Sequence, residues 1–244
     1  MKRLLLFLLF ASPACAQFAV PAYRPNSSAG GGASTYTFSQ TTFVAENSST
    51  VASITSPAIT VTAGDVAIVW CRSQLSTVTS ITASDSTSSF YTALTFRSAS
   101  SPGAAQGSYS LSLGGGSTTF KCTPNVSVAF QAMIVLVYHH SGSAATFDTQ
   151  TGNTPVSVTT ATSPSFTTSA ASLIVMCGTI NGATTFTAGS IGANTATVRG
   201  IAGASGSTDG VCEDTQFGSN QTSITASVTS AVSLNWVESV VSLK

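Results

Sequence analysis

The segment from Val126 to His140 constrains the fold of this chain more than any other. Every second residue of this segment is apolar up to Tyr138, and the intervening residues are apolar from Met133 to Val137. Because the side chains of a strand alternate between its two faces, this pattern predicts a strand with one core-facing surface and a second surface that becomes buried toward its end. Such a strand lies near the middle of a sheet that is covered on both sides.

The rest of the chain shows the same kind of pattern. Thr, Val, Phe and Ile occur in short runs between Gly, Ser, Pro, Asn and Asp, which predicts β-strands joined by turns, and no amphipathic helix is found. The other predicted strands are Tyr36–Val44, Val51–Thr62, Asp65–Ser73, Val78–Ala83, Phe90–Arg97, Ser108–Leu113, Thr118–Cys122, Thr146–Gln150, Val156–Thr160, Ser172–Ile180, Thr184–Thr187, Thr195–Arg199, Gly210–Gln216, Ser223–Val228 and Ser233–Leu243. The chain is therefore expected to be all-β.

A weak internal repeat runs through these predicted strands. Ser56–Ala63 matches Ser163–Ala170, and the apolar run Val66–Trp70 aligns without a gap to Leu173–Cys177. Each copy gives a Ser-Pro strand, a tight turn, a buried strand, a variable segment and a closing strand. The chain therefore consists of two weakly similar halves.

The two halves predict one architecture. They lie at about residues 50–142 and 156–244, and neither would bury its sheet faces well alone. We therefore expect a single domain over residues 35–244, folded as a two-sheet β-sandwich of jelly-roll type, which is a double Greek-key arrangement. All-β sandwiches of this length commonly form one domain.

The N-terminal residues are expected to lie outside that domain. Residues 1–16 combine a positively charged start, an apolar run and a small-x-small cleavage site, which is the pattern of a secretory signal peptide. The chain is thus expected to be secreted or displayed at the cell surface, with the bacterial periplasm as an alternative.

Residues 17–34 are predicted to form a flexible arm. They contain two prolines and three consecutive glycines. Their start is apolar, with Phe18, Val20 and Tyr23. The preferred interpretation of this segment is a disordered leader, and the alternative is that these three residues dock on a neighbouring subunit.

Four cysteines remain after the signal peptide: Cys71, Cys122, Cys177 and Cys212. An even number in an exported chain predicts two disulfides, with three possible connectivities. In the repeat, Cys177 aligns with Trp70, so Cys71 and Cys177 point to opposite faces of equivalent strands. A bridge between those two is the least favoured, and one bridge within each half is preferred.

Charge limits the partners of this chain. Charged residues make up 7%, and removal of Lys2 and Arg3 leaves six basic against eight acidic residues, a net charge of −2. The absence of a basic patch argues against nucleic-acid binding. After the first twenty residues no stretch approaches the ~18 consecutive apolar residues of a spanning helix. No nucleic-acid partner, membrane span or cofactor is expected.

Several short motifs resemble a known group of proteins. These are Ala63-Gly64-Asp65 before an apolar strand, the strand end Val137–Gly142, and the second Ser-Pro strand, which ends in Ser169-Ala170. Over about residues 51–243 the chain resembles a loose group of secreted bacterial β-sandwich proteins, mostly of unknown function, found among cell-surface and extracellular proteins. The group's Asp-x-x-Gly-Asn-x-Tyr hairpin is partly present at residues 85–91. The resemblance implies no catalytic residue.

No catalytic residue is predicted. The sequence contains no Gly-x-Ser-x-Gly elbow, no His-Glu-x-x-His motif and no phosphate-binding Gly-rich loop. The histidines, His139 and His140, are adjacent and point to opposite faces of a strand, so they are not expected to share a metal. Glu238 lies in an apolar strand and requires a basic partner. The candidates for this partner are Arg72, Arg97 and Arg199.

Two groups of residues are candidate binding sites. The densest acidic group, Asp209, Glu213 and Asp214, offers oxygen ligands for calcium, but its spacing fits no EF-type loop, so a cysteine-pinned polar hairpin is the preferred interpretation and no metal is predicted. Aromatic side chains on the variable segments are expected at the surface, where they would serve as flat platforms for a sugar. These candidates are Tyr91, Phe96, Tyr109 and Phe217.

The sequence leaves three classes of function. The preferred one is a non-catalytic structural or adhesive protein outside the cell that associates with itself, for example as a filament subunit, or with a surface glycan or protein. The reason is that strands apolar on both faces need a second cover, from the chain itself or from a neighbour. A carbohydrate-binding module is the alternative. A secreted glycoside hydrolase or esterase ranks third.

Overall fold

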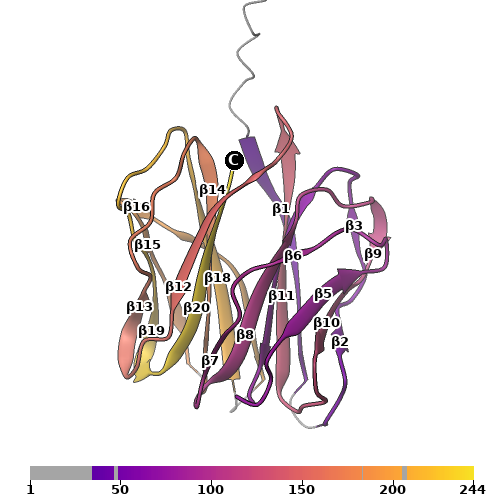
Figure 1. The fold of residues 1–244 in the computed structure, drawn as a ribbon, viewed down its shortest axis with the longest axis vertical. Helices are drawn as coiled ribbons and strands as arrows, with labels where there is room; N and C mark the ends of the chain where they lie inside the picture. Colours follow the sequence, from indigo (N-terminus) through magenta and orange to yellow (C-terminus); the bar gives the residue numbers. More distant parts are fainter. Residues whose placement is uncertain (1–34, 47–48, 183, 205–207) are drawn as a thin grey trace, which may run out of the picture. The chain divides into compact units, whose positions relative to one another are not determined.

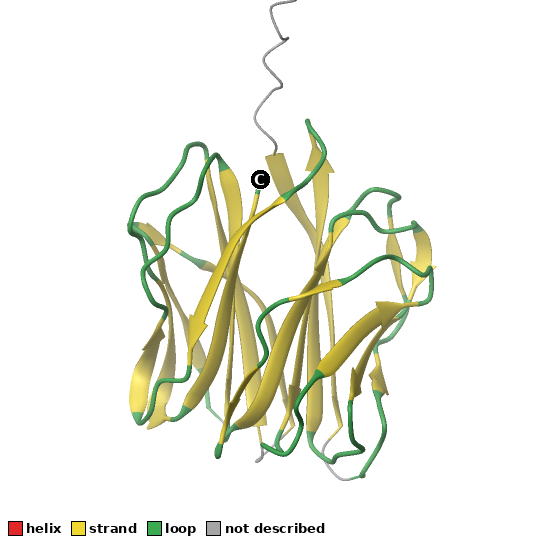
Figure 2. Ribbon diagram, viewed as in Figure 1, coloured by secondary structure: helices red, strands yellow, loops and turns green. Residues whose placement is uncertain are grey.

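The computed structural model describes residues 35–46, 49–182, 184–204 and 208–244. Over these residues the chain forms β-strands and no helix (Figure 2). The predicted all-β class is therefore confirmed.

Two large antiparallel sheets form the centre of the fold. The first central sheet has the order β1-β11-β4-β8-β6, with β7 also paired to β8, and the second has the order β12-β20-β14-β18-β17. Their strands are β1 (Thr35–Glu46), β4 (Val66–Ser73), β6 (Thr92–Ala93), β7 (Arg97–Ala99), β8 (Gly103–Ser110), β11 (Gln131–Ser141), β12 (Phe147–Asn153), β14 (Ser172–Ile180), β17 (Thr197–Ala204), β18 (Thr208–Phe217) and β20 (Trp236–Leu243).

Smaller sheets cover the outer faces of the central ones. The first outer layer contains the sheet β2-β10-β5 and the pair β3-β9, and the second outer layer is the sheet β13-β19-β15-β16. Their strands are β2 (Ile54–Thr55), β3 (Ile59–Val61), β5 (Ile81–Asp85), β9 (Gly116–Thr118), β10 (Phe120–Pro124), β13 (Val158–Thr162), β15 (Phe186–Ile191), β16 (Asn194–Thr195) and β19 (Ala226–Leu234).

Three apolar cores separate these four layers. One core fills the space between the two central sheets, and each of the others lies between a central sheet and its outer layer. Figure 1 shows the succession, with β2, β10 and β5 at one side and β13 and β19 at the other. The core between the central sheets contains Ile134 and Val175. The core under the first outer layer contains Val135 and Phe120, and the core under the second outer layer contains Met176 and Val228.

The predicted single two-sheet jelly roll needs correction, because the described strands form five sheets. The physical reason lies in strands β4, β11 and β14, which are buried on both faces over most of their length. In a two-sheet sandwich one face of each sheet would remain exposed. Here the other half covers one face of each central sheet, and an outer layer from the same half covers the other. The chain therefore provides its own cover for the strands that are apolar on both faces.

The internal repeat is visible in the strand order. Strands β1-β11-β4-β8 of the first half correspond to β12-β20-β14-β18 of the second, and β2-β10-β5 correspond to β13-β19-β15. Even an irregularity recurs: pairing shifts register between Phe38 and Gln40 in β1 and between Phe147 and Thr149 in β12. The two halves thus share one topology, and equivalent positions can be compared residue by residue.

The Ser-Pro motif explains part of this similarity. The Ser56 N–H donates to the Phe120 carbonyl at 2.8 Å, and the Ser56 hydroxyl accepts from the Phe120 N–H at 2.9 Å. Ser163 forms the same two hydrogen bonds with Ala226, at 2.8 and 3.0 Å. In both halves the serine continues the pairing of the outer sheet at a position where the following proline has no N–H to donate.

Both disulfides lie within a half, as the repeat predicted. Cys71 is bonded to Cys122, and Cys177 is bonded to Cys212. The first bridge ties β4 of the first central sheet to β10 of the first outer layer. The second joins neighbouring strands, β14 and β18, at directly paired positions.

Candidate functional site

The structure separates the side chains of two members of the predicted acidic group. Glu213 and Asp214 are neighbours on β18, so their side chains point to opposite faces. Asp214 accepts a hydrogen bond from the Tyr138 hydroxyl at 2.7 Å and pairs with the Arg199 guanidinium at 2.9 Å. The side chain of Asp209 lies outside the described part. Among the described residues no group of three or more His, Cys, Asp or Glu side chains is arranged to hold a metal.

Asp214 instead belongs to a contact between the two halves. Tyr138 comes from β11 of the first half, whereas Asp214 and Arg199 come from the second, and the guanidinium lies 4.4 Å from the centre of the Phe38 ring. Burial, followed by the charge of Asp214, raises the pKa of Tyr138 well above its usual value, so the phenol stays a donor. This cluster closes the corner between β1 and β17.

Glu238 is buried without the arginine pairing that the sequence predicted. Neither of its carboxylate oxygens has a hydrogen-bond partner in the described part of the chain. Burial raises the pKa of Glu238 to about 8, and the charge of Arg97 opposes this only in part. Of the other two candidates, Arg199 pairs with Asp214 and Arg72 donates to the Phe130 carbonyl at 2.8 Å.

The two histidines make separate contacts. His139 Nδ1 lies 3.1 Å from an Asp65 carboxylate oxygen, and the other oxygen of Asp65 accepts from the Thr62 N–H at 2.9 Å. The His140 ring lies instead beside Tyr36, with ring centroids 4.8 Å apart. Asp65 thus caps its turn, and His139 supports that cap.

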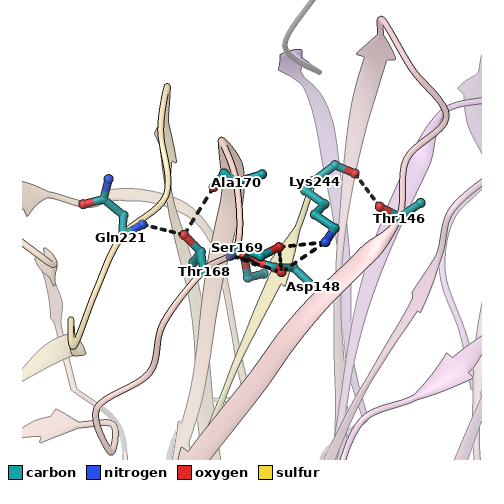
Figure 3. A network of polar contacts seen from close by, with 8 residues as sticks. Thr146, Asp148, Thr168, Ser169, Ala170, Gln221 and Lys244 are labelled. Carbon is teal, nitrogen blue, oxygen red and sulfur yellow. Dashed lines mark hydrogen bonds and ion pairs between the residues drawn. The ribbon is translucent and has the colours of Figure 1, made fainter. Parts of the chain in front are cut away.

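A polar network at the equivalent place in the second half has the same structural role (Figure 3). Asp148 accepts from the Ser169 N–H at 3.0 Å and from the Ser169 hydroxyl at 2.6 Å, while the Lys244 ammonium donates to that hydroxyl at 2.7 Å. Partial burial pushes the pKa of Asp148 upward, but hydrogen bonds from Ser169 and the Lys244 charge outweigh it and hold the pKa below its usual value.

The aromatic candidates are less exposed than expected. Tyr109 and Phe217 are buried, and Tyr91 and Phe96 are half-buried against the first outer core. The expectation that Tyr109 and Phe217 lie at the surface is therefore wrong, because both occupy core-facing positions at strand ends. Their role in ligand binding stays a prediction.

Phe90, which the sequence analysis did not select, is the most exposed large apolar residue of the described part, at 82%. Beside it lies a pocket of about 230 Å³ whose accessible wall is almost entirely apolar. Tyr109 forms one wall and stacks on Phe147 of β12, with ring centroids 5.5 Å apart and planes 9° apart. The lining residues are Phe90, Thr92, Tyr109, Ser110, Leu111 and Ser112, which we call the Phe90 pocket.

The loop before Phe90 is held rigidly by one carboxylate. Asp85 Oδ1 accepts from the Thr87 N–H at 2.8 Å and the Ser89 N–H at 3.1 Å, and Oδ2 accepts from the Tyr91 hydroxyl at 3.0 Å. Burial and the charge of Asp85 raise the pKa of Tyr91, so this phenol remains a donor. Both neighbours of Phe90, Ser89 and Tyr91, are thereby held by Asp85.

An Asp85→Ala substitution is expected to release this loop without unfolding the protein. The change removes the acceptor of several hydrogen bonds at a partly exposed site, so the loss of unfolding free energy should stay near 1–3 kcal/mol. Hydrogen exchange should accelerate at Thr87 and Ser89 and remain unchanged at the Ser163–Ala226 pair. Unchanged protection at Thr87 and Ser89 would contradict the role given to Asp85.

The repeat provides an internal comparison for the Phe90 pocket. The repeat aligns Ile68 with Val175; Ile68 pairs with Tyr109 and Val175 pairs with Asp214, so Tyr109 corresponds to Asp214. On the next strand Thr92 pairs with Tyr109 and Thr197 pairs with Asp214, so Phe90, two residues earlier, corresponds to Thr195. The second half therefore adopts the same topology with a polar residue at each of these two positions. The fold therefore does not require an aromatic side chain at either position.

A second depression lies on the opposite face of β6. It measures about 170 Å³ and is more polar than the Phe90 pocket. Its lining residues are Ser80, Ile81, Thr82, Ala83, Tyr91, Ala93, Gln106 and Ser108, which we call the Tyr91 pocket. The sheet edge at β6 thus carries a pocket on each face.

Comparison with known proteins adds no assignment to this site. In the described ranges, no helix has the length and apolar character needed to cross a membrane. No protein-family model, curated protein or solved structure matches the chain.

Proposed function

We propose that this protein is a non-catalytic adhesive or structural protein outside the cell, which contacts another macromolecule through the Phe90 pocket. The observation that carries this proposal is a phenylalanine 82% exposed on a loop that Asp85 holds in place. Exposed aromatic side chains on preorganised loops are typical of binding surfaces. Two disulfides are consistent with an oxidising compartment.

The sequence-based argument for self-assembly loses one of its supports. Strands apolar on both faces suggested cover by a neighbouring molecule, but the other layers of the same chain supply that cover. The proposal therefore depends on the Phe90 pocket and not on an unfilled sheet face.

A carbohydrate-binding module is the second candidate. The flat ring of Phe90 lies in a pocket that also includes the hydroxyl-bearing residues Thr92, Ser110 and Ser112. A sugar stacks its C–H face on an aromatic ring and directs its hydroxyls to such neighbours. The small volume of the pocket suits one sugar ring.

A Phe90→Ser substitution tests the proposed function. We expect binding of the secreted protein to itself, to immobilised polysaccharides or to cell-surface preparations to weaken at least about tenfold, as for a central interface residue. The thermal midpoint should hardly change, because the replaced ring is exposed. The matched control is Val156→Ser, which removes a residue 67% exposed at another place. Equal binding by the parent protein and the Phe90→Ser variant in all three assays would exclude the proposal.

A further inference from the structure

The edge of the first central sheet at β6 offers unpaired backbone groups. The Leu94 N–H donates inward to the Gly107 carbonyl at 2.8 Å, so the backbone of Ala93 and Thr95 points outward. The Thr95 N–H is bonded to the Gln150 side chain at 2.9 Å. In the part of the chain that the structure describes, no hydrogen bond occupies the outward N–H and C=O of Ala93. An extended peptide is able to pair at this position.

The two pockets lie on the two faces of this edge. Phe90 and Thr92 border the apolar Phe90 pocket, while Tyr91 and Ala93 border the more polar Tyr91 pocket. Successive side chains of an extended peptide point to opposite faces. A strand added at β6 would therefore place one side chain over the Phe90 pocket and its neighbours over the Tyr91 side. Each pocket has the size for a single side chain or ring.

The sequence contains a segment with matching chemistry. From Gln17 to Tyr23 the chain reads Gln-Phe-Ala-Val-Pro-Ala-Tyr and carries no charged side chain. Phe18 and Val20 are two residues apart and fall on one face of an extended peptide, and Ala19 falls on the other. A strand that has no charged side chain and carries Phe18 suits an apolar pocket, where an unpaired charged side chain would be costly.

We propose that the Phe18–Tyr23 segment of a second copy of this chain adds as a strand to the β6 edge, with Phe18 seated in the Phe90 pocket. The inference rests on the proposed function, for which it names the partner. Backbone pairing at Ala93 gives affinity, and the Phe90 pocket gives selectivity for an aromatic residue.

The length of the intervening chain favours a second copy over the same chain. β1 and β6 are the two edge strands in the order β1-β11-β4-β8-β6. Across these strands the pairing places Thr92 of β6 in line with Thr41 of β1, which is six residues beyond Thr35. A route from Thr35 around the end of the sheet to β6 measures about 40 Å, from strand spacing and residue rise. The eleven residues 24–34 reach that distance only when fully extended. As a flexible chain they span about 18 Å.

The experiment uses the mature chain, residues 17–244, throughout. Sedimentation velocity over a range of concentrations is expected to show self-association. The association constant should fall at least about tenfold with Phe18→Ser, with Phe90→Ser and with Ala93→Pro, which removes the outward N–H. Val156→Ser should leave it unchanged. A synthetic peptide of residues 17–34 should compete with the association, and the same peptide carrying Phe18→Ser should not.

Two results would overturn this inference and leave the proposed function intact. One is a strictly monomeric chain that still binds a glycan in a Phe90-dependent manner. The other is self-association that Phe90→Ser weakens and Phe18→Ser does not. If Phe90→Ser changes neither self-association nor any binding, both proposals fail together.

Discussion

A Glu238→Gln variant is expected to be about 5 kcal/mol more stable than the parent protein at pH 9 and within about 1 kcal/mol of it at pH 5, since a tenfold change in proton affinity corresponds to about 1.4 kcal/mol. Burial raises the pKa of Glu238 in the folded protein to about 8, against an ordinary value of 4.5. Between these values the unfolded chain has lost the proton and the folded chain still holds it. The free energy of unfolding contributed by this group therefore falls as the pH rises from 4.5 to 8. Glutamine keeps the shape of the protonated acid and has no charge to bury.

Urea unfolding at pH 5, 7 and 9 measures this effect. Glu213→Gln provides the comparison, because burial raises the pKa of Glu213 only to about 7. Its gain in stability should be smaller and complete at a lower pH. Glu213 also accepts a hydrogen bond from the Gly189 N–H, which a glutamine oxygen is able to retain. A Glu238→Gln variant with no gain at pH 9 would show that this carboxylate is solvated or paired in the folded protein.

Replacing both Cys71 and Cys122 with Ala is expected to lower the free energy of unfolding by about 2–5 kcal/mol. This disulfide spans 51 residues of sequence and joins the first central sheet to its outer layer. Its loss frees the unfolded chain and removes the covalent tie between two layers. Urea unfolding measures the first consequence, and hydrogen exchange at β10 measures the second.

The Cys177–Cys212 bridge is the matched control. It spans 35 residues, so its loop-closure entropy is nearly the same, but it joins two strands that already pair by backbone hydrogen bonds. Removing it should cost similar stability and leave exchange at β10 unchanged. Equal acceleration at β10 in both double variants would contradict the view that the first bridge holds the outer layer in place.

Strand positions were predictable where the apolar pattern was strong. The predicted strand Ser172–Ile180 matches β14 at both ends, and Asp65–Ser73 matches β4 to within one residue. The long segment from Val126 was less regular: β11 begins only at Gln131, after Phe130, which has a positive φ of 55°. Val128 forms only an isolated bridge before that turn. Alternation of apolar residues does not distinguish a bend from a continuous strand.

The candidate site was predictable only in part. Tyr109 was selected and does line the Phe90 pocket, but as a buried wall and not as an exposed platform. Phe90 was missed because it was read as the first residue of a strand. One signal was available: Phe90 follows directly on the polar run Ser86–Ser89. The predicted arm residues Phe18, Val20 and Tyr23 lie outside the described residues.

The sequence by itself determined the all-β class and the two related halves, and it favoured one disulfide within each half without fixing the connectivity. These follow from local alternation and from a repeat that aligns residue with residue. The number of layers was decided only by the tertiary structure, because residues such as Ile134 and Val175 meet across sheets from different halves. The exposure of Phe90 was decided in the same way. Whether a face is covered depends on contacts between distant segments, and a pattern along one strand does not contain that information.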